Sequence, residues 1–297
     1  MSLTLKRLFM AAFGLLGALA LWPCLLGIQY LQPRFPSYLV YALAQGASLG
    51  AVFGALFGSF EGLIVSSRSK AFKGLLFGAL AGALAGAIGV LAGQFFLFAA
   101  GSILWKSASQ RNSLGLAVST GLAWAIVGLF VALIEGLRSR SSRKLLVGLS
   151  GGLLGGVIGG AGLSALSYLF PASALSLLAG LALFGLALSL SYSLFENRFS
   201  AGSFILLNGP LKGKEYYLLS KVLRIGSAPD CDIVLKGYPE VELLHATVRQ
   251  SGTRLLISAE KAGARVLLND EPPAGRSLRP EDVLAIGKAK LIYGYFS

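Results

Sequence analysis

The chain has 297 residues, of which 55% are hydrophobic and only 13% are charged, and its mean hydropathy is +0.72. This balance is typical of integral membrane proteins and excludes a wholly soluble protein. Most of the formal charge of +13 lies in residues 1–202, which hold 13 basic and 3 acidic side chains. Such a distribution favours charges that set topology and contact membrane lipids, and it argues against nucleic-acid binding. With two cysteines and one histidine, no disulfide, metal site or cofactor is expected.

The first apolar run extends from Leu8 to about Ile28 and follows two basic residues. Residues 18–20 resemble a signal-peptide cleavage site, but the run continues to a length that spans about 30 Å of hydrocarbon. We therefore expect an uncleaved first transmembrane helix. Further spans are expected near residues 38–64, 71–100, 113–137, 144–169 and 173–195. The predicted class is an α-helical polytopic membrane domain of about six glycine-rich helices over residues 1–200.

Glycines recur at every fourth position in two parts of this domain. A four-residue step is close to one helical turn, so these glycines share one helix face. Aligning Glu61 with Glu135 superimposes the glycine pattern at an offset of 74 residues, which indicates an internal repeat at 46–89 and 120–163. In a bilayer a glycine face lets another helix approach closely, so packing is favoured over a pore lining. The predicted packing positions are Gly74, Gly78, Gly82, Gly86, Gly148, Gly152, Gly156 and Gly160.

Basic residues gather on one side of the six-helix arrangement. They precede the first helix, fill the turns at 68–73 and 138–144, and end the last span at Arg198. The positive-inside rule therefore places the N-terminus and the C-terminal domain in the cytoplasm, with the protein in a plasma or inner membrane.

Few polar side chains fall within the spans. Glu61, Glu135 and Glu196 lie near the cytoplasmic helix ends, where pairing with basic neighbours is a simpler interpretation than a proton relay. Gln45 and Gln94 are expected to hydrogen-bond across helices rather than to line a path.

Residues 203–297 have a different sequence pattern, in which short β-type runs are separated by turns. About 95 residues with this spacing predict one all-β sandwich domain. Three stretches carry a resemblance to forkhead-associated (FHA) domains: 224–235, which reads Arg-Ile-Gly-Ser-Ala-Pro-Asp-Cys-Asp-Ile-Val-Leu, then 241–246 and 278–287. The resemblance implies an FHA-like sandwich and a loop site of the kind that reads phosphothreonine.

That implied site departs from the family pattern. Ser227 follows the turn residue Gly226 where the family has an arginine, and Glu242 stands where the family has a serine. Gly263 is retained in the asparagine–glycine loop, but Ala262 replaces the asparagine. His245 is retained and is expected to brace the site. The resemblance thus implies weakened phosphate binding, because an arginine contact is lost and a carboxylate is gained. Arg224 and Arg249 are the candidate substitute cations.

The sequence shows no constellation of nucleophile and base and no phosphate-cradling loop in a suitable context. We therefore expect a non-catalytic membrane protein whose divergent FHA domain binds a cytoplasmic protein partner, as a scaffold or signalling adaptor. Two alternatives stay open at this point: a channel or transporter with an FHA-like regulatory domain, and a membrane phosphothreonine receptor. Whether the chain forms a homo-oligomer is also open.

Overall fold

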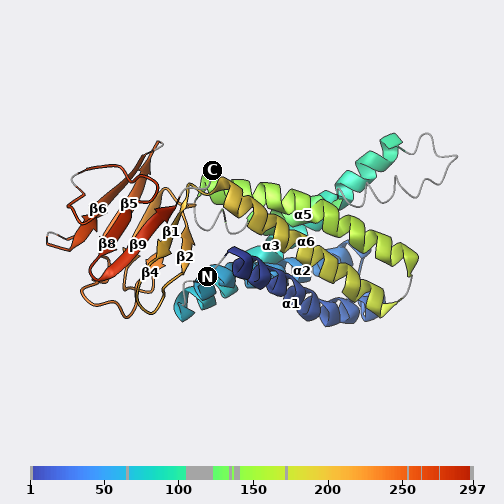
Figure 1. Ribbon diagram of the computed structural model, residues 1–297. Helices are drawn as coiled ribbons and strands as arrows, with labels where there is room; N and C mark the ends of the chain where they lie inside the picture. The colour runs from blue at the N-terminus through green and yellow to red at the C-terminus, as the bar shows by residue number, and fades with distance from the viewer. Residues whose placement is uncertain are drawn as a thin grey trace.

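A computed structural model describes residues 3–64, 67–104, 123–133, 136, 141–170, 173–252, 254–261, 263–273 and 275–294. A bundle of long helices and a β-sandwich lie end to end (Figure 1). The long helices are α1 (Leu3–Tyr30), α2 (Tyr38–Ile64), α3 (Arg68–Leu104), α5 (Ser142–Leu169) and α6 (Ala174–Phe199). All five are long and apolar enough to cross a membrane. The polytopic membrane domain expected from hydropathy is thereby confirmed.

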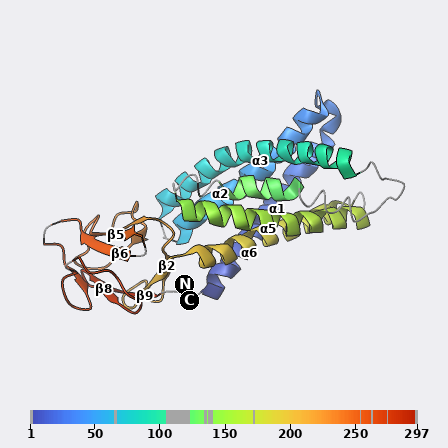
Figure 2. The ribbon, with the colours of Figure 1, turned by 90° about the horizontal axis from the view of Figure 1, so that it is seen from above.

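Of the predicted span at 113–137, the structure describes an apolar helical segment, Ala123–Leu133, and the backbone of Gly136. The rest of that span lies outside the described residues, as do Glu135 and the side chain of Glu61. The start of α1, the end of α2, the starts of α3 and α5 and the end of α6 lie at the sandwich end of the bundle (Figures 1 and 2). The described residues of the two predicted basic turns, 68–73 and 141–144, lie at the starts of α3 and α5 and therefore beside the sandwich.

Helices α2 and α3 form a hairpin whose two glycine faces meet. Four glycines of each helix lie opposite four glycines of the other, and a Cβ at any of these four α3 glycines would fall on a backbone carbonyl oxygen of α2. The opposed pairs are Gly46 with Gly86, Gly50 with Gly82, Gly54 with Gly78, and Gly58 with Gly74. Only glycine permits such an approach, because every other residue places a carbon atom where the facing backbone lies.

Helix α5 lies between two neighbours. Gly152 faces the carbonyl oxygen of Gly128 in the segment Ala123–Leu133, while Gly155 faces the Cα of Leu188 on α6. Helix α1 reaches α6 through Gly14 and Gly185, which face each other's carbonyl groups. The centre of the bundle is filled by aromatic rings; Phe53 of α2 contacts Phe184 of α6 edge to face, with centroids 5.7 Å apart.

The C-terminal part is a sandwich of two sheets, which confirms the predicted all-β domain. One sheet has the order β2-β1-β9-β8-β7 and the other β4-β3-β5-β6, with β3 and β4 parallel and the remaining pairs antiparallel. The strands are β1 (Ser203–Leu206), β2 (Glu215–Tyr217), β3 (Val222–Gly226), β4 (Ile233–Val234), β5 (Ala246–Ser251), β6 (Arg254–Ala259), β7 (Val266–Leu268), β8 (Val283–Ile286) and β9 (Ala289–Gly294). Alternate side chains of these strands form a continuous apolar core between the sheets.

The connection from α6 to β1 is short and hydrogen-bonded. Ala201 donates its N–H to the carbonyl of Leu218 (3.0 Å) and accepts a bond from the Tyr293 hydroxyl (2.8 Å). Gly202 has a φ of +131°, which disfavours other residues at this bend. Burial raises the pKa of Tyr217, and the carboxylates of Glu215 and Glu196 raise it further. The last turn of α6 is therefore close to the edge strand of the sandwich.

Candidate functional site

The loop that follows β3 and the loop that precedes β5 are fastened together at one end of the sandwich. Ser227 donates both its backbone N–H and its hydroxyl to the carbonyl oxygen of Glu242, at 2.9 and 3.0 Å. Gly226 is required beside them, because a Cβ there would meet the carbonyl of Leu243. The fold thus brings together Gly226, Ser227 and Glu242, which the sequence singled out.

His245 lies beneath these loops and is 1% exposed. Its Nδ1 accepts the backbone N–H of Glu242 (3.1 Å), so that nitrogen carries no proton, and its Nε2 lies 3.1 Å from the carbonyl oxygen of Arg265. An unprotonated Nδ1 leaves the ring's proton on Nε2, which donates to that carbonyl. Both nitrogens are therefore engaged with backbone groups, in an arrangement that joins the loop before β5 to the loop before β7.

The carboxylate of Glu242 is paired with an ammonium group. Lys261 Nζ lies 3.3 Å from Glu242 Oε2, and the two side chains are 69% and 50% exposed. The sequence did not single out Lys261, because it follows Glu242 by 19 positions and two complete strands, β5 and β6, lie between them. Gly263 follows in the same loop with a φ of +93° and open space around its Cα. Ala262 lies outside the described residues.

Arg224 is directed elsewhere. Its Nη1 lies 3.8 Å from Asp230 Oδ2, and its backbone N–H donates to Asp232 Oδ2 at 2.8 Å. Its side chain lines a cleft between the sandwich and the helices, together with Lys70. Arg249 is exposed on β5, where it pairs with Val222 of β3. The cation that contacts Glu242 is thus Lys261, and not either of the two candidate arginines.

Two turns of the helical bundle dock onto the sandwich through repeat-related serines. Ser67 Oγ donates to the carbonyl oxygen of Pro229 (3.1 Å), and Ser141 Oγ donates to that of Leu219 (2.5 Å). The two serines stand at the 74-residue spacing of the sequence repeat. Each hydroxyl also accepts the backbone N–H three residues later, at 3.3 Å, and so caps the helix that begins there.

A basic side chain reinforces each docking contact. Lys70 Nζ donates to the carbonyl oxygen of Cys231 (2.5 Å), and Arg143 Nη1 donates to that of Leu218 (3.3 Å). All four acceptors of the two turns are backbone carbonyls in the loops that flank β3. The basic turns, which sequence analysis used only to set topology, therefore also hold the C-terminal domain against the membrane helices.

The sandwich is similar to domains of known proteins. The family model described as "Inner membrane component of T3SS, cytoplasmic domain" matches residues 205–294. The chain is similar to an FHA domain studied for phosphothreonine-dependent interactions, at 22% identity and a TM-score of 0.29, over 32% of this chain and 96% of that one. It is also similar to the FHA domain of the CT664 protein from Chlamydia trachomatis, at 21% identity and a TM-score of 0.30, over 32% and 97%. No curated protein matched the chain.

A further similar structure is the FhaA FHA domain complexed with the intracellular domain of Rv3910, at 23% identity and a TM-score of 0.28, over 31% of this chain and 97% of that one. The family match begins within β1 and extends to the end of β9. The C-terminal domain is FHA-like. This confirms the resemblance that the stretches at 224–235, 241–246 and 278–287 predicted. Gly226, Ser227, Glu242, His245 and Gly263, the loop positions that the resemblance implied as a site, all lie within this domain.

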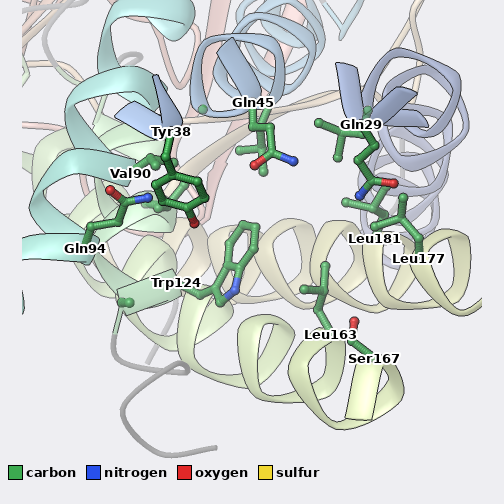
Figure 3. A pocket seen from close by; sticks show the side chains of 16 residues that line it. Gln29, Tyr38, Gln45, Val90, Gln94, Trp124, Leu163, Ser167, Leu177 and Leu181 are labelled. Atoms are coloured by element: carbon green, nitrogen blue, oxygen red, sulfur yellow. The ribbon is translucent and has the colours of Figure 1, made fainter. Parts of the chain in front are cut away.

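A cavity of about 390 Å³ lies within the helical bundle, between α1, α2, α3, the segment Ala123–Leu133, α5 and α6. Figure 3 shows Gln29, Tyr38, Gln45, Gln94 and Trp124 around it. The expectation that Gln45 bonds across helices is wrong, because its Nε2 donates to the Tyr41 hydroxyl of its own helix (3.0 Å). The described lining consists of apolar, amide and hydroxyl-bearing side chains with the indole of Trp124, and it includes no acidic or basic group.

Proposed function

We propose that the protein is a non-catalytic membrane scaffold whose FHA-like domain binds a protein partner in the cytoplasm. The observation that carries the proposal is the Glu242–Lys261 pair (3.3 Å). This pair lies on the loop face, the surface formed by the loop after β3, the loop before β5 and the loop before β7. A phosphothreonine carries about −1.5 to −2 charges near neutral pH. On this face it would meet a carboxylate, and the adjacent ammonium already balances that carboxylate. The face therefore suits an unphosphorylated protein surface.

Neighbouring groups give the loop face the mixed character of a protein interface. Leu243, next to Glu242, is 70% exposed. Glu240 lies 3.4 Å from Lys288 and 4.0 Å from Arg265. An exposed apolar side chain amid partly exposed ion pairs offers one anchor and a polar rim, as protein-binding surfaces do. The family matched by this domain is described as the cytoplasmic domain of an inner membrane component, which supports the same arrangement.

A peptide titration tests the recognition mode. Full-length protein in mild detergent is titrated with a library of phosphothreonine peptides and with the same peptides unphosphorylated, and we expect no difference in Kd. Ser227→Arg combined with Glu242→Ser should raise affinity for the phosphorylated set, because it supplies a cation and removes the carboxylate. Phosphate-dependent binding by the unaltered protein in the micromolar range would instead establish a phosphothreonine receptor.

A cross-linking experiment tests the partner itself. A photo-reactive amino acid at position 243 is expected to cross-link a protein in native membranes, because Leu243 is exposed on the loop face. Lys212 is exposed in the loop between β1 and β2 and serves as the control position. Equal cross-linking from both positions, or from neither, would contradict a specific protein-binding face.

The orientation is part of the proposal and has its own test. Ser142, at the exposed start of α5, lies beside the docking serine of the second turn. A cysteine placed there by Ser142→Cys should resist membrane-impermeant reagents applied to intact cells and should react after the cells are opened. Strong labelling from outside would reverse the assigned topology and remove the case for a cytoplasmic partner.

The cavity of Figure 3 supports a second candidate function, the passage of a small polar molecule. Gln45 and Gln94 supply amide groups at the depth of the spans, where polar side chains commonly mark a substrate path. Flux of uncharged and charged solutes into proteoliposomes tests this directly. From the scaffold role we expect no flux, and flux of any of these solutes would favour the second candidate function.

A further inference from the structure

A cleft of about 950 Å³ separates the FHA-like domain from the starts of α3 and α5. The walls come from both repeat turns on one side and from the loops flanking β3 on the other. Five basic side chains and two acidic ones line it. The basic residues are Lys70, Lys73, Lys144, Lys221 and Arg224, and the acidic ones are Asp230 and Asp232.

The two carboxylates do not balance these charges. Both are engaged with Arg224, one through its guanidinium (3.8 Å) and the other through its backbone N–H (2.8 Å). Lys70 is held by a neutral carbonyl group, that of Cys231. Lys144 is only 8% exposed, whereas Lys73 and Lys221 are exposed. The described lining thus carries an excess of positive charge in a partly enclosed space, where screening by water is weaker than at an open surface.

Two helix N-termini add to this positive potential. Helices α3 and α5 begin at Arg68 and Ser142, and their first turns contribute Ser69, Lys70 and Lys144 to the cleft wall. The N-terminal end of a helix carries a partial positive charge and favours bound anions. The apolar spans of the same helices also begin at Arg68 and Ser142. The cleft is therefore at the level where lipid headgroups meet the cytoplasm.

We propose that this cleft binds a phosphate-bearing anion, supplied either by a lipid headgroup or by a soluble phosphate compound. The anion would lie between the ammonium groups of Lys70, Lys73 and Lys221, and so would link the membrane helices to the FHA-like domain. This site is separate from the loop face of Glu242 and Lys261, and it goes beyond the proposed scaffold function. Its occupancy would strengthen the docking of the two parts of the chain.

The test uses full-length protein in an uncharged detergent and two probes, inorganic pyrophosphate and short-chain phosphatidylglycerol, with short-chain phosphatidylcholine as the neutral lipid. Binding is followed by calorimetric titration. Lys73→Gln combined with Lys221→Gln should weaken binding about tenfold or more, because two charge-assisted contacts are lost. Lys212→Gln combined with Lys236→Gln removes the same charge from exposed positions away from the cleft lining and should leave the Kd unchanged.

The probes distinguish the source of the anion. Binding of pyrophosphate alone supports the proposal with a soluble phosphate as ligand, and binding of phosphatidylglycerol but not phosphatidylcholine supports it with a lipid headgroup. Failure of both probes to bind overturns the proposal. Equal weakening by the control pair also overturns it, because the effect would then follow from net charge. Both lysine pairs are exposed, so a matching size-exclusion profile and thermal unfolding midpoint show that each variant is folded.

Discussion

The two glycine-rich hairpins have nearly the same sequence pattern but pack differently. In the first, the glycines of α2 face the glycines of α3 along four consecutive turns, backbone against backbone. In the second, the matching glycines of α5 face a glycine, two alanines and Trp124 in the segment Ala123–Leu133. Helix α5 also presents Gly151, Gly155 and Gly159 to α6, whereas the outer face of α3 carries exposed leucines such as Leu80 and Leu84.

This difference shows how one glycine pattern serves two structural roles. The four repeat glycines of α3 contact one partner helix, so one small-residue face is sufficient for that contact and the opposite face can be large and apolar. Helix α5 of the second hairpin lies between two neighbours, so it needs small residues on both of the faces that contact them. Close approach on both faces maximises van der Waals contact, which is the main source of helix association where lipid removes the hydrophobic driving force.

Gly78→Leu should have the largest effect and tests the first hairpin. The new side chain would fall on the carbonyl of Gly54, so α2 and α3 must separate along the whole interface. We expect a destabilisation of about 3 kcal/mol and loss of most monodisperse protein in detergent, measured by size exclusion and thermal unfolding. Gly27→Leu is the matched control, because no atom lies within 4 Å of a Cβ at that position. Equal behaviour of the two variants would show that the glycine face is no packing interface.

Gly152→Leu and Gly155→Leu test whether α5 is packed on two faces. A Cβ at Gly152 would lie 2.6 Å from the Gly128 carbonyl oxygen, and one at Gly155 would lie 2.5 Å from the Cα of Leu188. Each variant should lower stability by about 1–3 kcal/mol, as overpacking usually does. Leu80→Ala on the outer face of α3 should change stability by much less. A neutral Gly155→Leu would contradict the central position of α5.

Ser141→Ala and Ser67→Ala compare the two docking turns. Both serines are buried, but the bond from Ser141 to the Leu219 carbonyl is short, at 2.5 Å, whereas the bond from Ser67 to the Pro229 carbonyl is longer, at 3.1 Å. Loss of either bond leaves a carbonyl unsatisfied, at a cost of about 1–3 kcal/mol. We expect Ser141→Ala to increase tryptic cleavage after Lys221 more than Ser67→Ala does. Cleavage after Lys212 should stay constant. A larger effect of Ser67→Ala would reverse the ranking of the two turns.

Alkylation of Cys231 should show the smallest effect and reports on the first turn alone. The thiol is buried and donates to the carbonyl of Leu243 (3.3 Å), and burial raises its pKa. A raised pKa leaves little thiolate at neutral pH, so alkylation should be slow and should accelerate as the pH rises toward that pKa. Lys70→Met removes the contact with the Cys231 carbonyl and a cation that lowers the pKa of the thiol; we expect the opening of the loop to dominate and to speed alkylation modestly, by about twofold. Arg143→Met, in the second turn, should leave the rate unchanged.

Several features could be read from the sequence because they depend on local pattern. The long helices follow from apolar length, and the shared glycine face follows from the four-residue period, whatever that face contacts. The sandwich follows from short β-type runs, and its FHA-like character follows from motifs around Gly226 and His245. Each of these signals lies within one continuous stretch of the sequence, where backbone periodicity and turn chemistry act.

Other features were decided only by the tertiary structure. Lys261 pairs with Glu242 across two loops, α5 is packed on two sides, and Gln45 bonds within its own helix. Ser67 and Ser141 dock onto carbonyl groups of Pro229 and Leu219. The physical reason is that every residue carries a backbone carbonyl, so the acceptors of a docking contact leave no mark in the sequence. A glycine face indicates that another group packs closely against it, but which group that is depends on how the helices assemble.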